Sequence, residues 1–105
     1  MDARTRSAVR IAKRYLLELK KHRFHVTKAY LYGSYVTGKI HAGSDIDIVV
    51  VSPQFTGYRL MDSYTIAKFC RAIDLRISPL AYRPEDFVED NLIPYEAITK
   101  GIRLL

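Results

Sequence analysis

The sequence predicts a single α/β (α+β) domain, a small mixed β-sheet of about three to four strands with helices packed on it. The length of 105 residues suits one compact domain, spanning 1–105. Helical and strand-like periodicities alternate along the chain in the order αβαβαβα, without an internal repeat or a linker. The hydrophobic content of 49% is ordinary for a globular protein and argues against disorder.

Apolar residues at three- and four-residue spacing predict the helices. Residues 2–22 carry such a stripe, and residues 59–71 are expected to form a second helix. A helical tail begins at Pro84, is divided at Pro94 and stops at Gly101. The residues expected to face inward from the second helix are Leu60, Tyr64, Ala67 and Cys70.

The strands are expected at 26–32, 45–52 and 73–78, each rich in β-branched, aromatic or alternating residues. Residues 102–105 add a short edge strand. Gly33-Ser34 ends the first strand, and Ser34 is a good N-cap for a short helix that reaches Gly38.

Composition limits the classes of function. The net charge of +6 favours nucleotides, nucleic acid or acidic proteins as partners, although general solubility explains it equally well. The single cysteine, Cys70, cannot form an internal disulfide, so a cytoplasmic location is expected. No apolar run is long enough to span a membrane, and no signal peptide is recognised.

Three aspartates carry the predicted chemistry. Asp45 and Asp47 lie two apart on one strand, so both carboxylates share a face, about 6–7 Å apart along the backbone. Asp74 begins the next strand and would reach the same place if the two strands pair. Repulsion between two ionised carboxylates 4 Å apart costs about 4 kcal/mol at an effective dielectric constant of 20. A hard cation, Mg²⁺ or Mn²⁺, relieves this repulsion. The enzymatic interpretation depends on this convergence; the alternative is a solvated strand edge.

Gly33 and Ser34 form the second half of the predicted site. Glycine allows the backbone to approach a phosphate closely, and the start of the short helix favours an anion. Metal-binding carboxylates beside a phosphate-binding turn are typical of phosphoryl-group transfer.

The spacing of these residues resembles a known family. Gly33-Ser34, ten residues, and then Asp45-Ile46-Asp47 is similar to the signature of the polymerase β-like nucleotidyltransferase superfamily, in particular its minimal nucleotidyltransferase (MNT) branch. The resemblance implies that Gly33 and Ser34 hold the β- and γ-phosphates, and that Asp45 and Asp47 ligate both metal ions of a two-metal site. It also implies that Asp74 ligates the catalytic metal and accepts the proton of the acceptor.

The resemblance further implies a partner. Minimal nucleotidyltransferases are antitoxins that adenylylate a tyrosine of a HEPN-domain toxin, so ATP with Mg²⁺ and a HEPN-like protein are expected, with an oligomer possible. Two alternatives stay open: an inactive antitoxin that neutralises by binding alone, and a nucleotidyltransferase acting on RNA or a small molecule. Thr37 stands where relatives often carry a basic residue, with Lys39 as a substitute, and Arg76 could pair with Asp74 instead of binding phosphate.

Overall fold

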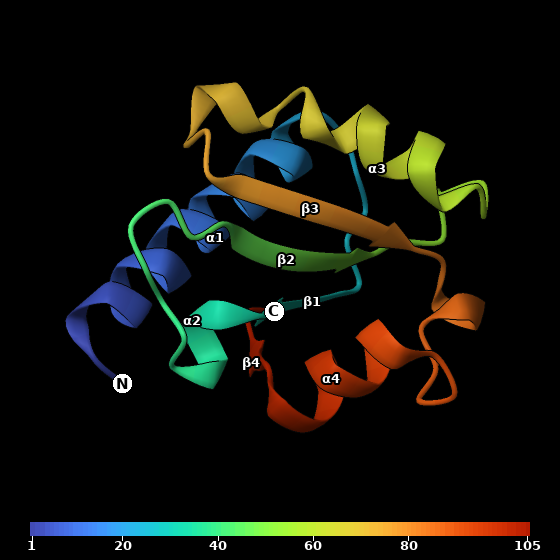
Figure 1. The fold of residues 1–105 in the computed structure, drawn as a ribbon. Coiled ribbons are helices and arrows are strands. Elements are labelled where there is room, and N and C mark those ends of the chain that lie inside the picture. Colours follow the sequence, from blue (N-terminus) through green and yellow to red (C-terminus); the bar gives the residue numbers. More distant parts are fainter.

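The computed structural model describes all 105 residues as a four-stranded sheet with helices on both faces (Figure 1). This architecture confirms the predicted fold class. The elements follow in the order α1 (Ala3–Lys21), β1 (Lys28–Tyr32), α2 (Ser34–Thr37), β2 (Ile46–Val51), α3 (Arg59–Ala67), the 3₁₀ turn η1 (Cys70–Ala72), β3 (Ile77–Tyr82), the 3₁₀ turn η2 (Pro84–Asp86), α4 (Leu92–Lys100) and β4 (Ile102–Arg103).

The sheet is mixed, with the spatial order β3-β2-β1-β4. Strand β1 pairs antiparallel with both β2 and β4, whereas β2 and β3 are parallel and joined through α3. The register places Asp47 between Tyr32 of β1 and Ser78 of β3. The carboxylates of β2 therefore lie at the end of the sheet where β1 runs into α2.

Helix α1 covers one face of the sheet. Asp2 caps it by accepting a hydrogen bond from the Thr5 amide at 2.9 Å. Its apolar stripe packs on one set of alternating strand residues to form the larger core. That core contains Ala8, Ala12, Tyr15, Leu16 and Leu19 from α1 and Ala29, Leu31, Ile46, Ile48, Val50, Ile77 and Ala81 from the strands.

Helix α4 covers the other face, where a smaller apolar cluster joins Tyr32, Val49, Val51, Tyr82, Phe87 and Ala97. In Figure 1, α1 and α4 lie on opposite sides of the sheet. Pro94 does not divide α4 as predicted, because it sits in the first turn, where the missing N–H has no partner in the helix anyway. Gly101 ends the helix, as predicted.

The third strand begins at Ile77, so the prediction of a strand over 73–78 is wrong. The alternation of Ile73, Leu75 and Ile77 resembled a half-buried strand, but Leu75 is 81% exposed. Asp74 belongs to a turn after η1, and its amide donates to the Cys70 carbonyl oxygen at 2.9 Å. The true strand contains Pro79, which β3 tolerates because it is an edge strand.

The inward face of α3 also differs from the prediction. Cys70, in η1, is buried as expected, but Leu60 and Tyr64 are exposed to 85% and 78%. The helix instead buries Asp62, Ser63 and Ile66. No helix of the chain is long and apolar enough to span a lipid bilayer.

Candidate active site

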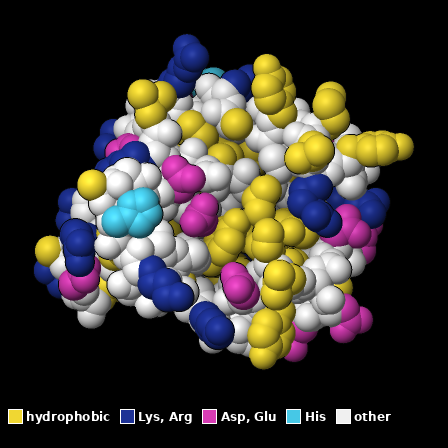
Figure 2. All heavy atoms as spheres, viewed as in Figure 1, with side chains coloured by type: hydrophobic (Ala, Val, Ile, Leu, Met, Phe, Trp, Pro, Cys, Tyr) yellow, Lys and Arg dark blue, Asp and Glu magenta, His cyan; other side chains and the backbone are white.

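Strand β2 places Asp45 and Asp47 on one face of the sheet, as predicted. Ile46, between them, is buried in the α1-side core, whereas Asp47 is half-buried and Asp45 is exposed on the α4 side. The loop before the strand is held by Ser44, whose buried hydroxyl accepts the His41 amide at 2.9 Å. Figure 2 shows acidic side chains over the start of β2, beside hydrophobic side chains over the sheet toward α4.

Gly33 packs directly against the carboxylate of Asp47. Its φ of +78° lies in the left-handed region, and a Cβ at this position would overlap Asp47 Oδ2 and lie 3.1 Å from Cγ. Glycine is therefore required both by backbone conformation and by space. The contact makes the β1–α2 turn one wall of the carboxylate site.

The short helix α2 starts from this glycine, and the predicted N-cap shifts by one residue. Gly33, not Ser34, occupies the N-cap position, and Ser34 is the first helical residue. The helical hydrogen bonds begin at the Val36 amide, which donates to the Gly33 carbonyl oxygen at 3.0 Å, so the Ser34 and Tyr35 amides are free of the helix. The Ser34 hydroxyl is also free for a ligand. Lys39 and His41 are exposed in the loop that follows.

Burial and charge repulsion raise the pKa of Asp47 to about 6. Burial is the larger cause, and the charge of Asp45 adds to it. The same site raises the pKa of Tyr32, first through burial and then through the negative charge of Asp47. Burial is the main cause of both shifts, and the negative charges of the two aspartates add a smaller part that a bound cation would relieve.

The donor set at this place fits a hard divalent cation. Mg²⁺ is usually held by one or two carboxylates, with waters and substrate phosphates completing its octahedron. Asp45 and Asp47 supply such a pair, and the turn at Gly33 leaves backbone amides beside it. The two aspartates and the turn could therefore hold a metal–triphosphate between them.

The structure does not bring Asp74 to the other two aspartates, which corrects the predicted three-carboxylate site. No group of three His, Cys, Asp or Glu side chains is arranged to hold a metal ion. Asp74 instead forms a bidentate ion pair with Arg76, at 3.1 Å from Nε to Oδ1 and 3.0 Å from Nη2 to Oδ2. The hydrogen bonds from Arg76 hold the pKa of Asp74 below its ordinary value, and Arg14 of α1 adds to the shift.

This ion pair belongs to the α1 side of the sheet. Arg76 Nη1 donates to the Tyr35 hydroxyl at 3.4 Å, and Tyr35 is part of the α1-side core. Arg76 also lines a pocket of about 300 Å³ together with Arg4 and His41. Arg76 thus neutralises Asp74 on the opposite side of the sheet from Asp47. This pairing is the alternative role that the sequence allowed for Arg76.

Ser78 is the β3 residue that lies beside Asp47 in the sheet. It is the β3 partner of Asp47, and registered neighbours in a sheet point to the same face. Ser78 is half-buried, and its hydroxyl makes no hydrogen bond within the chain. The sequence pattern missed this residue because the misplaced strand assigned no position opposite Asp47; only the register shows it.

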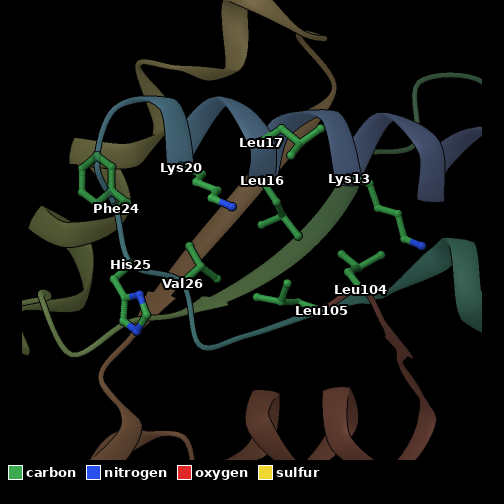
Figure 3. A pocket seen from close by; sticks show the side chains of 9 residues that line it. All are labelled: Lys13, Leu16, Leu17, Lys20, Phe24, His25, Val26, Leu104 and Leu105. Atoms are coloured by element: carbon green, nitrogen blue, oxygen red, sulfur yellow. The ribbon is translucent and has the colours of Figure 1, made fainter.

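A groove larger than the pocket at Arg76 lies elsewhere. A groove of about 600 Å³ runs between the second half of α1 and the last residues of the chain, as Figure 3 shows. Its lining is mostly apolar, including Leu16, Leu17 and Leu104, with Lys13 and Lys20 at its rim. It contains no carboxylate and does not compete with Asp45 and Asp47 as a metal site.

The sequence matches the family model described as a nucleotidyltransferase domain over residues 9–103. The chain belongs to the nucleotidyltransferase domain family. The matched residues include Gly33, Ser34, Asp45 and Asp47. No curated protein matches the sequence.

Three solved structures share this nucleotidyltransferase fold. A candidate nucleotidyltransferase from Sulfolobus solfataricus is 22% identical with a TM-score of 0.62, over 84% of this chain and 79% of that one. A toxin–antitoxin structure with AMP-PNP is 22% identical with a TM-score of 0.60, over 89% of this chain and 72% of that one. A mutant of the toxin–antitoxin MntA-HpeT is 20% identical with a TM-score of 0.61, over 88% of this chain and 70% of that one.

Proposed function

We propose that this nucleotidyltransferase domain binds ATP with Mg²⁺ (or Mn²⁺) and transfers AMP to a protein. The observation that carries the proposal is the contact between Gly33 and the Asp47 carboxylate, which joins the phosphate-binding turn to the carboxylate pair. Asp45 and Asp47 would hold the cation, while Ser34 and the free amides of α2 would bind the β- and γ-phosphates.

The reaction is a displacement at the α-phosphorus. A hydroxyl oxygen of the acceptor forms a bond to the α-phosphorus, the bond to the bridging oxygen of the β-phosphate breaks, and pyrophosphate leaves. The acceptor proton would pass to water, because the Asp74 carboxylate is engaged by Arg76. The metal supplies charge neutralisation for the phosphates, and the protein supplies positioning.

A HEPN-domain toxin is the proposed acceptor, with a tyrosine hydroxyl receiving the AMP. Two structures that share the fold are toxin–antitoxin complexes, and one of them contains AMP-PNP. In such an assembly the second protein would provide the acceptor hydroxyl.

Neutralisation by binding alone is a second candidate function. It is favoured by one observation: the position opposite Asp47 is Ser78, and the aspartate expected there is paired with Arg76. In this case the site would retain nucleotide without efficient transfer, and the toxin would be inhibited by contact.

A labelling experiment separates the two. The purified chain is incubated with a candidate HEPN-domain partner, Mg²⁺ and ATP labelled at the α-phosphate. We expect label on the partner, lost in Asp45→Asn and Asp47→Asn and retained in Asp90→Asn, which removes an exposed carboxylate outside the site. An unlabelled partner that is still neutralised by the two site variants would favour the binding function.

A further inference from the structure

Helix α3 presents large apolar side chains to solvent. Leu60 and Tyr64 are exposed to 85% and 78%, and Tyr58 and Met61 to 76% and 67%. Figure 2 shows hydrophobic side chains standing out from the surface over α3. Scattered exposed apolar residues are normal, but four large ones within seven residues mark an interaction surface.

Polar anchors fix this orientation of the helix. The buried Asp62 carboxylate accepts the Thr56 amide at 3.0 Å, the Thr56 hydroxyl at 2.9 Å and the Gly57 amide at 3.0 Å. Ser63 Oγ accepts the Ala81 amide at 2.9 Å. Turning α3 to bury Leu60 and Tyr64 would break these bonds and leave buried polar groups unpaired, which costs about 1–3 kcal/mol for each group.

The unpaired charges around this surface are positive. Arg59, Lys68 and Arg71 are exposed and form no ion pair, Asp62 is buried, and the nearby carboxylates of Glu85 and Asp86 are paired with Arg83. A two-fold contact with a second copy would place positive charges against positive charges. Charge complementarity instead favours a different protein whose apolar surface is bordered by Asp and Glu.

The neighbouring sheet edge offers no alternative way to bind. Along the outer side of β3, the Ile77 amide donates to the Asp74 carbonyl oxygen at 3.3 Å, Pro79 has no N–H, and the Ala81 amide is taken by Ser63. A partner therefore cannot add a strand to this edge and has to contact side chains of α3.

We infer that the exposed face of α3, formed by Tyr58, Leu60, Met61 and Tyr64 with Lys68 and Arg71 beside it, is the docking surface for an acidic protein partner. The inference deepens the proposed function, on which it rests, because the surface would hold the protein that receives AMP or is neutralised. Aromatic, Met and Arg side chains are the types enriched in protein interfaces.

Site-specific photocrosslinking in the native cells tests the inference. Benzoylphenylalanine is placed at position 60 or 64, and at Leu92 of α4 as the control, because Leu92 is 74% exposed but lies outside this surface. We expect one protein to crosslink from positions 60 and 64 at least tenfold more than from position 92, through a peptide that carries Asp or Glu. Lys68→Glu combined with Arg71→Glu should reduce that crosslink at least fivefold.

Three outcomes would overturn the inference: crosslinks to a second copy of this chain, equal crosslinking from position 92, or no crosslink from positions 60 and 64. Failure of the proposed function is recognised separately. Leu60→Glu and Tyr64→Glu leave the nucleotide site intact, so both variants should bind Mg²⁺–ATP like the unaltered chain. Loss of ATP binding by the unaltered chain would instead contradict the proposed function.

Discussion

The α-carbon of Gly33 packs against the carboxylate of Asp47, leaving no room for a side chain at residue 33. This contact joins two segments that are fourteen residues apart in sequence, the turn after β1 and the start of β2. The contact explains why the glycine turn and the carboxylate occur together. The turn positions the Asp47 carboxylate, and the carboxylate leaves space only for glycine at residue 33.

Gly33→Ala should therefore disrupt the site more than glycine replacement elsewhere. We expect it to destabilise the fold by about 2–4 kcal/mol, from backbone strain and displacement of Asp47, and to abolish Mg²⁺–ATP binding. Gly38→Ala is the control for a positive φ alone: its φ of +81° and ψ of 8° are left-handed helical, a milder strain than at Gly33 with its ψ of −148°, and no atom lies within 4 Å of the new Cβ. For each variant, urea denaturation measures the free energy of unfolding and calorimetric titration measures Mg²⁺–ATP binding. Equal effects of the two substitutions would contradict the role of the contact.

The raised pKa of Asp47 predicts a pH dependence. Because the folded-state pKa is about 6 and the ordinary value is 3.8, ionised Asp47 is less favourable in the folded than in the unfolded chain. Its contribution to the free energy of unfolding should fall as pH rises from about 4 to about 6 and stay constant above. Asp47→Asn should then be more stable than the unaltered chain by about 1–2 kcal/mol at pH 7.5 without metal, and no more stable at pH 4. A difference that is independent of pH would exclude this cause.

Divalent-cation affinity should follow the same titration, because a cation competes with a proton at Asp47. We expect Mn²⁺ binding, measured by calorimetry, to weaken about tenfold for each unit of pH below about 6. Asp90→Asn should leave the profile unchanged.

Asp74 provides a test of the corrected site. Its carboxylate is paired with Arg76 away from Asp47, so Asp74→Asn should retain Mg²⁺–ATP affinity within about twofold and lose less than about 1 kcal/mol of stability. Asp47→Asn measured in parallel should lose binding. If Asp74→Asn abolished binding as Asp47→Asn does, the separation of the two carboxylates would be wrong.

Ser78 offers the converse experiment. Ser78→Asp would place a third carboxylate beside Asp47, which should raise divalent-cation affinity about tenfold and lower the stability of the metal-free chain by about 1–3 kcal/mol. The neutral Ser78→Asn controls for size. A gain in AMP transfer by Ser78→Asp would also show that the unaltered site lacks this group. No change in metal affinity would place residue 78 outside the site.

The fold class and the Asp45–Asp47 pair could be predicted because both depend on local patterns. Alternation around Ile46 fixes the shared face of the two aspartates, and helical spacing fixes the buried stripe of α1. The third strand could not be placed, since Ile73, Leu75 and Ile77 alternate as well as the true strand does, while Pro79 obscures that strand. Its position is decided by long-range pairing with β2.

The orientation of α3 was unpredictable for a related reason. Its spacing of Leu60 and Tyr64 indicates an inward apolar face, and only the contacts of Asp62 and Ser63 with other segments reverse it. Likewise, Gly-Ser indicates a serine cap, whereas Gly33 holds the N-cap position in the structure and packs on Asp47. For α3, polar contacts between distant segments override the local pattern.

Calorimetric titration with Mg²⁺ and a non-hydrolysable ATP analogue tests the central claim most directly. The claim is that Asp45 and Asp47, with the turn at Gly33, hold a metal–triphosphate. The account predicts one saturable site in the unaltered chain, dependent on the cation and lost in Asp45→Asn and Asp47→Asn but kept in Asp74→Asn and Asp90→Asn. Binding that persists in both Asp45→Asn and Asp47→Asn, or no binding by the unaltered chain, would contradict it.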